Sequence, residues 1–183
     1  MLTETLRDAI SIGLLEKRHA PAMLDFVERG RERFVDWIPF VGKTRDLADF
    51  EALIRRFLKM YAEGSGAFYA LWDGALMVGM VLIKEIDEEV RQAEIGYMID
   101  LEYEGRGLVK AACLKLIGFL FEDMCMQKIR ICCDDRNARS IALAERLGFS
   151  LEGNLRRDSK INGNIRNTMH FGLLKEEWSP ESP

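Results

Sequence analysis

Two glycines, Gly105 and Gly107, flank Arg106 where a long apolar helix is expected to begin. A helix start leaves backbone N–H groups without a partner, and Ser, Thr, Asp or Asn usually caps them. No such side chain stands at this start. The amides of residues 106–109 would therefore converge with the positive end of the helix macrodipole, and glycine lets a phosphate group approach the backbone closely. The spacing predicts an anion-binding loop at residues 104–109.

Two common phosphate-binding loops do not fit this segment. A dinucleotide fingerprint needs a third glycine and an acidic residue at the end of the next strand, and both are missing. A nucleoside-triphosphate loop needs Gly-Lys-Ser/Thr, which is also absent. A tight strand-to-helix turn, capped imperfectly by Glu104, is the alternative at this point. Gly96, inside the preceding strand, indicates a bulge or a close approach of other atoms to the backbone.

Length and composition limit the classes of protein that fit. The 183 residues suffice for one domain with a real core, and 48% hydrophobic and 31% charged residues are typical of a globular chain. The net charge of −4 comes from 26 basic and 30 acidic residues spread along the chain, so neither free nucleic acid nor a membrane surface is an expected partner. The N-terminus lacks the pattern of a secretory signal, and no stretch reaches membrane-spanning length, so we expect a cytoplasmic location.

The cysteines and histidines do not predict a metal centre. They are Cys113, Cys125, Cys132, Cys133, His19 and His170. The cysteine spacing is neither a disulfide framework nor a zinc pattern, and two histidines make a Cys–His nucleophile an unpromising assignment. We therefore expect no metal and buried free thiols.

Hydrophobic periodicity predicts a mixed chain of helices and strands that must position the loop. The expected helices are residues 20–29, 45–63, 108–124 and a segment from Asn137 to Gly148. The expected strands are residues 6–15, two strands of a hairpin over 68–83 with its turn at Asp73-Gly74, 91–99, 128–133, and a closing pair at 150–157 and 165–174 with a turn at Asn162-Gly163.

Three further patterns accompany the glycine loop. They are Trp-Ile-Pro-Phe at residues 37–40, Asn-x-x-Ser at 137–140 and Leu-Gly-Phe-x-x-Glu-Gly at 147–153. Together they resemble the GNAT family of N-acetyltransferases, and the details resemble its ribosomal-protein (RimJ/RimL-type) branch. This resemblance implies a single-domain α/β (α+β) fold over residues 1–176. Its mixed, mostly antiparallel seven-stranded sheet would splay at the fourth and fifth strands, with about four flanking helices. Residues 177–183 are expected to be a disordered tail.

The resemblance also implies acetyl-coenzyme A as the acetyl donor. The implied cofactor-binding residues are Tyr97, Met98, Ile99, Glu104, Gly105, Arg106, Gly107, Leu108, Val109, Asn137 and Ser140. The loop would hold the pyrophosphate, although Glu104 and Val109 depart from the residues that the family prefers. A carboxylate repels a pyrophosphate, so we expect Glu104 to point away. The pantetheine arm would lie like an added strand against Met98 and Ile99, where a free backbone N–H could stabilise the oxyanion by on the order of 3 kcal/mol.

The predicted chemistry is direct attack of an amine on the thioester. By position, Ser140 is the candidate proton donor to the departing thiolate, and the alternative is that Asn137 and Ser140 only cap a helix. Glu94 and Asp158 are the candidate bases, and each has an alternative structural role. A free α-amino group has a pKa of about 7.7–8.0, so its deprotonation at pH 7 costs only about 1–1.4 kcal/mol, against about 4.6 kcal/mol for a lysine side chain. The lack of an evident base therefore favours an α-amine.

Trp37 and Phe40 are expected to line the site that binds this amine, with packing of a loop as the alternative. The expected acceptor is the N-terminal α-amine of a ribosomal or other protein. Two alternatives are a small amine, such as an amino acid or polyamine, and a non-catalytic acyl-coenzyme A-binding module. The sequence leaves a homo-oligomer open.

Overall fold

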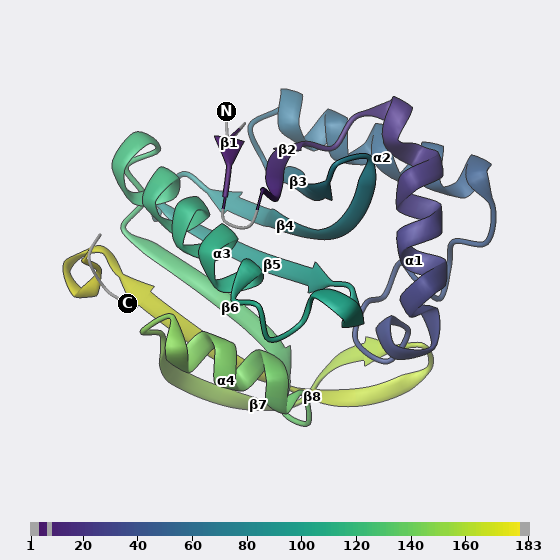
Figure 1. The fold of residues 1–183 in the computed structure, drawn as a ribbon. Helices are drawn as coiled ribbons and strands as arrows, with labels where there is room; N and C mark the ends of the chain where they lie inside the picture. Colours follow the sequence, from purple (N-terminus) through teal and green to yellow (C-terminus); the bar gives the residue numbers. More distant parts are fainter. Residues whose placement is uncertain (1–3, 7–8, 180–183) are drawn as a thin grey trace.

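The protein is described from a computed structural model, which covers residues 4–6 and 9–179. One mixed sheet runs through the molecule, in the order β1-β2-β3-β4-β5-β6-β8-β7 (Figure 1). The strands are β1 (Glu4–Thr5), β2 (Ser11–Leu14), β3 (Ala67–Asp73), β4 (Leu76–Asp87), β5 (Gln92–Ile99), β6 (Lys128–Asp134), β7 (Ser150–Ile161) and β8 (Asn164–Leu174). Within the described chain, β5 and β6 form the one parallel pair.

Helices cover both faces of the sheet. They are α1 (Ala20–Phe34), α2 (Leu47–Ala62), α3 (Leu108–Gly118) and α4 (Ala138–Arg146). The helices α3 and α4 lie together on one face, where they share a core with Tyr69 and Ile131 (Figure 1). The helices α1 and α2 pack on the other face, with Phe68 and Met98. Because successive side chains of a strand point to opposite faces, β3 is buried on both sides over residues 67–71.

The sheet opens between β5 and β6. Their parallel ladder runs from Gln92 opposite Lys128 to Ile95 opposite Ile131 and ends there. The rest of β5 pairs with β4 alone, as far as Ile99. The predicted splay at the fourth and fifth expected strands is therefore confirmed, and it gives β5 a free backbone edge.

The predicted class of fold is confirmed, with local differences. All seven expected strands are present, and the two-residue β1 adds an eighth at the edge. The first strand was predicted too long: Ala9 has a φ of 60° and Leu6 N–H donates to the carbonyl of Ile10 (2.7 Å), so a turn separates β1 from β2, and residues 7–8 lie outside the described part. Asp73 pairs with Leu76, which moves that hairpin turn one residue later than predicted.

Two predicted chain segments end differently from expectation. The helix predicted over residues 108–124 is α-helical only to Gly118, and a π-helical turn covers Phe119–Asp123. Ordered chain extends beyond residue 176, since Trp178 packs against Phe121 with ring centroids 5.5 Å apart. Residues 180–183 of the expected tail lie outside the described part.

Candidate active site

A cavity of about 1030 Å³ enters the sheet where β5 and β6 diverge. We call its two halves the donor end and the acceptor end. The donor end is lined by Tyr103–Gly105, Gly107–Lys110, Asn137–Ser140, Ala142, Leu143 and Arg146. The acceptor end is lined by Arg33, Phe34, Trp37–Phe40, Arg56, Phe57, Met60, Phe68, Leu82 and Lys84. Residues of β5 and β6 line the junction between the two ends.

The glycine loop forms the floor of the donor end. Gly105 and Gly107 have φ values of 73° and 72°, in the left-handed region that favours glycine. Gly107 is the N-cap of α3 and no side chain caps this helix, as predicted. The first N–H groups of an α-helix have no acceptor within it, so they and the macrodipole favour an anion at this position. No heavy atom lies within 4 Å of the position where a Cβ at Gly105 would stand, so the loop surface is open.

Glu104 carries a negative charge that is unfavourable beside an anion site, and two arginines balance this charge. Arg33, near the end of α1, forms an ion pair with its carboxylate and donates to the carbonyl of Ile99 at 2.6 Å. Arg139, on α4, lies 3.6 Å from the same carboxylate oxygen. The carboxylate is therefore engaged by cations from distant parts of the chain. Nothing local in the sequence indicates Arg33, which the sequence analysis missed.

Ser140 and Tyr97 meet at the junction of the two ends. The Asn137 side chain accepts a hydrogen bond from the backbone N–H of Ser140 (3.1 Å) and caps α4. The Ser140 hydroxyl is 2.7 Å from the Tyr97 hydroxyl, and that hydroxyl also contacts the Ser140 carbonyl at 3.2 Å. Burial raises the pKa of Tyr97, so its phenol stays protonated at neutral pH. The Ser140 side chain is thus held in one place beside the cavity.

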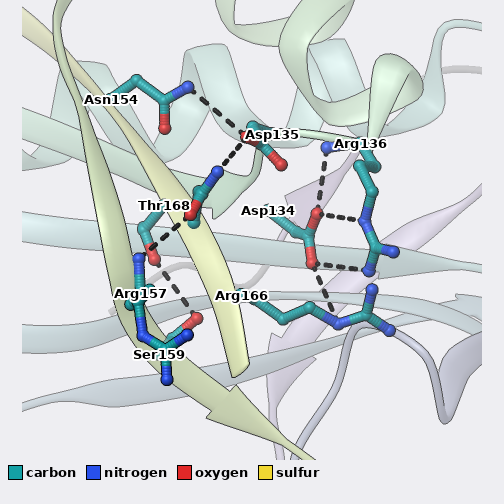
Figure 2. Close-up of polar contacts among 9 residues, drawn as sticks. Asp134, Asp135, Arg136, Asn154, Arg157, Ser159, Arg166 and Thr168 are labelled. Carbon is teal, nitrogen blue, oxygen red and sulfur yellow. Dashed lines mark hydrogen bonds and ion pairs between the residues drawn. The ribbon is translucent and has the colours of Figure 1, made fainter. Parts of the chain in front are cut away.

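A buried carboxylate fixes the turn that precedes α4. Asp134, the last residue of β6, accepts hydrogen bonds from the backbone N–H (2.9 Å) and the Nε (3.2 Å) of Arg136 (Figure 2). The Nε of Arg166, from β8, lies 3.5 Å from its other oxygen. The Asp134 side chain is only 1% exposed, so these two guanidinium groups supply most of its stabilisation.

The neighbouring Asp135 ties the same turn to β7 and β8. It accepts a hydrogen bond from the side-chain amide of Asn167 (2.8 Å). It also accepts one from the side-chain amide of Asn154 (3.4 Å), as Figure 2 shows. Asn167 in turn accepts from the backbone N–H of Arg157 (3.0 Å). This network anchors the turn that carries Asn137 and Ser140. The sequence analysis did not single out any of these residues.

The two predicted bases do not line the cavity. Glu94 is 12% exposed and forms an ion pair with Lys84, and Arg130 lies 3.9 Å from its other oxygen. Asp158 is on β7, where its carboxylate lies 3.7 Å from Nε2 of His170. Of the three predicted catalytic residues, the structure therefore brings only Ser140 to the cavity wall.

Most of the other predicted site residues line the cavity. Those that line the cavity are Trp37, Phe40, Tyr97, Met98, Ile99, Glu104, Gly105, Gly107, Leu108, Val109, Asn137 and Ser140. Arg106 does not, and its guanidinium lies over the Tyr103 ring, 4.8 Å from the ring centroid. Phe40 packs on Phe57 at a centroid distance of 6.3 Å, so the aromatic wall also has a structural role.

The described residues contain no group of three or more His, Cys, Asp or Glu side chains placed to hold a metal ion. Over the same part of the chain, no helix has the length and apolar character needed to cross a bilayer.

The splayed sheet and the uncapped helix start beside it define the class: an α/β protein with an anion-favouring helix N-terminus next to an open strand edge. The family model for the acetyltransferase (GNAT) domain matches residues 12–150, and the chain belongs to this family of N-acetyltransferases. YdaF of Bacillus subtilis (strain 168), which bears the provisional name of a ribosomal N-acetyltransferase, is 34% identical over 99% of this chain and 100% of its own length.

Two other similar proteins are acetyltransferases that act on different kinds of amine. A spermidine N(1)-acetyltransferase of Escherichia coli (strain K12) is 31% identical, over 56% of this chain and 55% of its own length. The solved structure of RimL, an acetyltransferase of ribosomal L7/L12 α-amines in complex with coenzyme A, superposes with a TM-score of 0.87 at 18% identity, over 94% of this chain and 96% of that one. The latter likeness shows a shared fold.

Proposed function

We propose that this N-acetyltransferase transfers the acetyl group of acetyl-coenzyme A to the N-terminal α-amine of a protein, by direct attack while both substrates are bound. Ribosomal proteins are the class that the names of its relatives suggest. The residues that line the donor end are suited to bind acetyl-coenzyme A. Left-handed glycines expose the start of α3, and Lys110, Arg139 and Arg146 add positive charge to the donor end. Bound acetyl-coenzyme A supplies an activated acetyl thioester.

The chain's own residues then have separate roles. The amides at the start of α3 bind the pyrophosphate, and the cations of the donor end hold further phosphate. The edge of β5 beyond Ile95 has no ladder partner on its β6 side, so its backbone groups can bind the pantetheine amides. A backbone N–H near Tyr97 or Met98 donates to the developing oxyanion. Ser140, held by Tyr97, donates a proton to the leaving thiolate.

The observation that carries the choice of acceptor is the charge of the cavity wall. Among the described residues that line it, two bear carboxylates, Glu104 and Asp134, and both are engaged by arginines. Arg33, Arg56 and Lys84 line the acceptor end. Arg33 and Lys84 are themselves paired with Glu104 and Glu94, so the described lining residues offer a polyamine no unpaired carboxylate to bind its other ammonium groups.

The same wall also fits an acceptor that needs little help to lose its proton. Glu94 and Asp158 stand outside the cavity, so no predicted base reaches an incoming ammonium group. A terminal α-amine is partly neutral at pH 7, whereas a lysine or polyamine nitrogen is almost entirely protonated. This supports an α-amine over the small-amine alternative.

The experiment compares acceptors of matched length. Peptides with a free α-amine, the same peptides with a blocked α-amine and an internal lysine, free amino acids and spermidine are each incubated with acetyl-coenzyme A, and thiol release and product mass are followed. We expect kcat/KM to be at least tenfold higher for the free α-amine than for the others. Faster turnover of spermidine would overturn the choice of acceptor. Coenzyme A binding in calorimetry without thiol release from any amine would instead show a non-catalytic binding module.

A further inference from the structure

Two thiols of the cavity wall, those of Cys132 and Cys133, have no role in this mechanism. Cys132 is the first residue of β6 beyond the last pair with β5, and it lines the cavity at the junction of the two ends. Its neighbours Ile131 and Cys133 face the core under α3 and α4, so alternation turns Cys132 to the opposite face, toward the acceptor end. Gly96, the residue that follows Ile95 on β5, has no side chain, and the Lys84 side chain lies 3.2 Å from the position that a Cβ there would occupy.

Behind this thiol lie an imidazole and a carboxylate. Cys132 pairs with His170 across β6 and β8, and its Sγ is 3.5 Å from Nδ1 of His170. Nε2 of His170 is buried without a hydrogen bond, and Asp158 lies 3.7 Å from it. A proton on Nε2, facing the carboxylate, leaves Nδ1 free to accept the thiol proton. Nucleophile, base and carboxylate thus stand in the order used by enzymes with acyl-accepting thiols, a Cys–His arrangement that the sequence analysis did not favour.

We propose that Cys132 is a second, internal acetyl acceptor, which takes the acetyl group of acetyl-coenzyme A when no amine occupies the acceptor end. The Cys132 sulfur bonds to the acetyl carbonyl carbon as the bond from that carbon to the coenzyme A sulfur breaks. The thiol proton passes to Nδ1 of His170, which does not line the cavity, so the departing thiolate takes its proton from solvent and His170 later returns its own proton to solvent. The products are S-acetyl-Cys132 and coenzyme A thiol. One thioester replaces another, so the step needs no further reactant.

The thiol's surroundings explain why this reaction needs His170. Burial, followed by the nearby Glu94 carboxylate, raises the pKa of Cys132 to about 12, so the free thiolate is scarce at neutral pH. Lys84 and Arg130, which pair with Glu94, act on this pKa in the opposite direction. Proton transfer to His170 during the attack avoids the free thiolate. The acetylated thiol would occupy the acceptor end and compete there with an amine. The proposal thus rests on the acetyl-coenzyme A site of the proposed function.

The test detects acetylation of the protein itself rather than transfer of the acetyl group to an amine. The full chain is incubated with saturating acetyl-coenzyme A and no amine, quenched in acid and digested, and the position of any hydroxylamine-labile acetyl group is found by mass spectrometry. The labelled peptide also contains the adjacent Cys133, so variants assign the site: we expect the label to be lost in Cys132→Ala and kept in Cys133→Ala. The matched control is Cys125→Ala, because Cys125 is an exposed thiol and its removal should leave the labelling unchanged.

Labelling rates test whether His170 and Asp158 assist the reaction or whether Cys132 reacts only because it is exposed to the cavity. We expect His170→Gln to slow labelling at least tenfold and Asp158→Asn to slow it less, with coenzyme A affinity unchanged in calorimetry. Absence of labelling in the wild-type protein, labelling of Cys125, or labelling that persists in Cys132→Ala would overturn the proposal. If His170→Gln is labelled as fast as the wild-type protein, the role of His170 as proton acceptor is overturned. If the protein binds coenzyme A and acetylates peptides but Cys132 stays unlabelled, this inference alone fails. If calorimetry detects no coenzyme A binding, the proposed function fails as well.

Discussion

The donor and acceptor ends of the cavity are built by different means. The floor of the donor end comes from one continuous segment, residues 104–110, and its main groups are backbone amides. The acceptor end gathers side chains from α1, the segment after it, α2, β3 and β4. A backbone site depends on local conformation, whereas a side-chain site depends on tertiary packing. The two ends should therefore respond differently to substitution.

The largest effect is expected at the junction of the two ends. Ser140→Ala removes the proposed proton donor while Asn137 still caps α4 through the backbone N–H of residue 140. General acid catalysis contributes about 10²–10⁴-fold, so we expect kcat to fall at least 100-fold. Coenzyme A affinity, measured by calorimetry, should change less than twofold. A variant that retained full kcat at saturating substrates would contradict the assignment.

A substitution of the partner hydroxyl sharpens this prediction. Tyr97→Phe leaves the Ser140 hydroxyl in place but removes the group 2.7 Å from it. If Tyr97 only orients Ser140, kcat should fall less than in Ser140→Ala. A larger fall would make Tyr97 the proton donor. Both rates come from the same thiol-release assay.

The contrast between the two ends also explains what the sequence could predict. The glycine loop was found because its signal is local: Gly105 and Gly107 stand beside an uncapped helix start. The seven strands and the splay followed from periodicity and from resemblance to the family. Arg33 could not be found, because it pairs with Glu104 across 71 positions of the sequence, and no short pattern encodes such a contact.

The two candidate bases, Glu94 and Asp158, also show that contacts between distant residues cannot be predicted from the sequence. Glu94 and Asp158 were chosen for their residue type and their position near the motifs. Packing then paired Glu94 with Lys84 and placed Asp158 beside His170, away from the cavity. Which face of a strand a carboxylate occupies can be predicted from alternation. Whether it is already neutralised depends on neighbours brought in by the fold.

The next largest effect is expected in the network before α4. Asp134→Asn keeps the shape of the side chain but leaves Arg166, whose side chain is 13% exposed, without its countercharge. Breaking a buried ion pair costs about 3–5 kcal/mol, and we expect the lower end because Arg136 is exposed to solvent. The measurement is the free energy of unfolding in urea.

Asp135→Asn is the matched control for this loss. Asp135 is less buried than Asp134 and receives its hydrogen bonds from neutral amides, so its substitution should cost about 1 kcal/mol or less. Equal losses for the two variants would show that the buried charge pair is not what holds the turn.

A smaller effect is expected from the glycine loop. Gly107→Val puts a branched side chain at a φ of 72°, where a residue with a Cβ is strained by about 1–2 kcal/mol. If the strain shifts the start of α3, coenzyme A should bind about tenfold more weakly, which calorimetry measures directly. Gly153→Ala is the control, since Gly153 has open space around it and no positive φ. Unchanged binding in Gly107→Val would show that the amides do not hold the phosphates.

The smallest expected effect tests the sign of the charge at the donor end. Glu104→Gln removes a carboxylate beside the anion site and releases Arg33 and Arg139 from it, while the amide can still accept a hydrogen bond. A partly exposed charge at this range is worth about 0.5–1 kcal/mol, so coenzyme A should bind about two- to fivefold more tightly. Calorimetry at low and high salt should show the gain shrinking as the charges are screened. Glu102→Gln, two residues earlier and exposed, should change little. Weaker binding in Glu104→Gln would instead mean that its pairing with Arg33 positions the loop, and the donor end would then depend on tertiary packing as the acceptor end does.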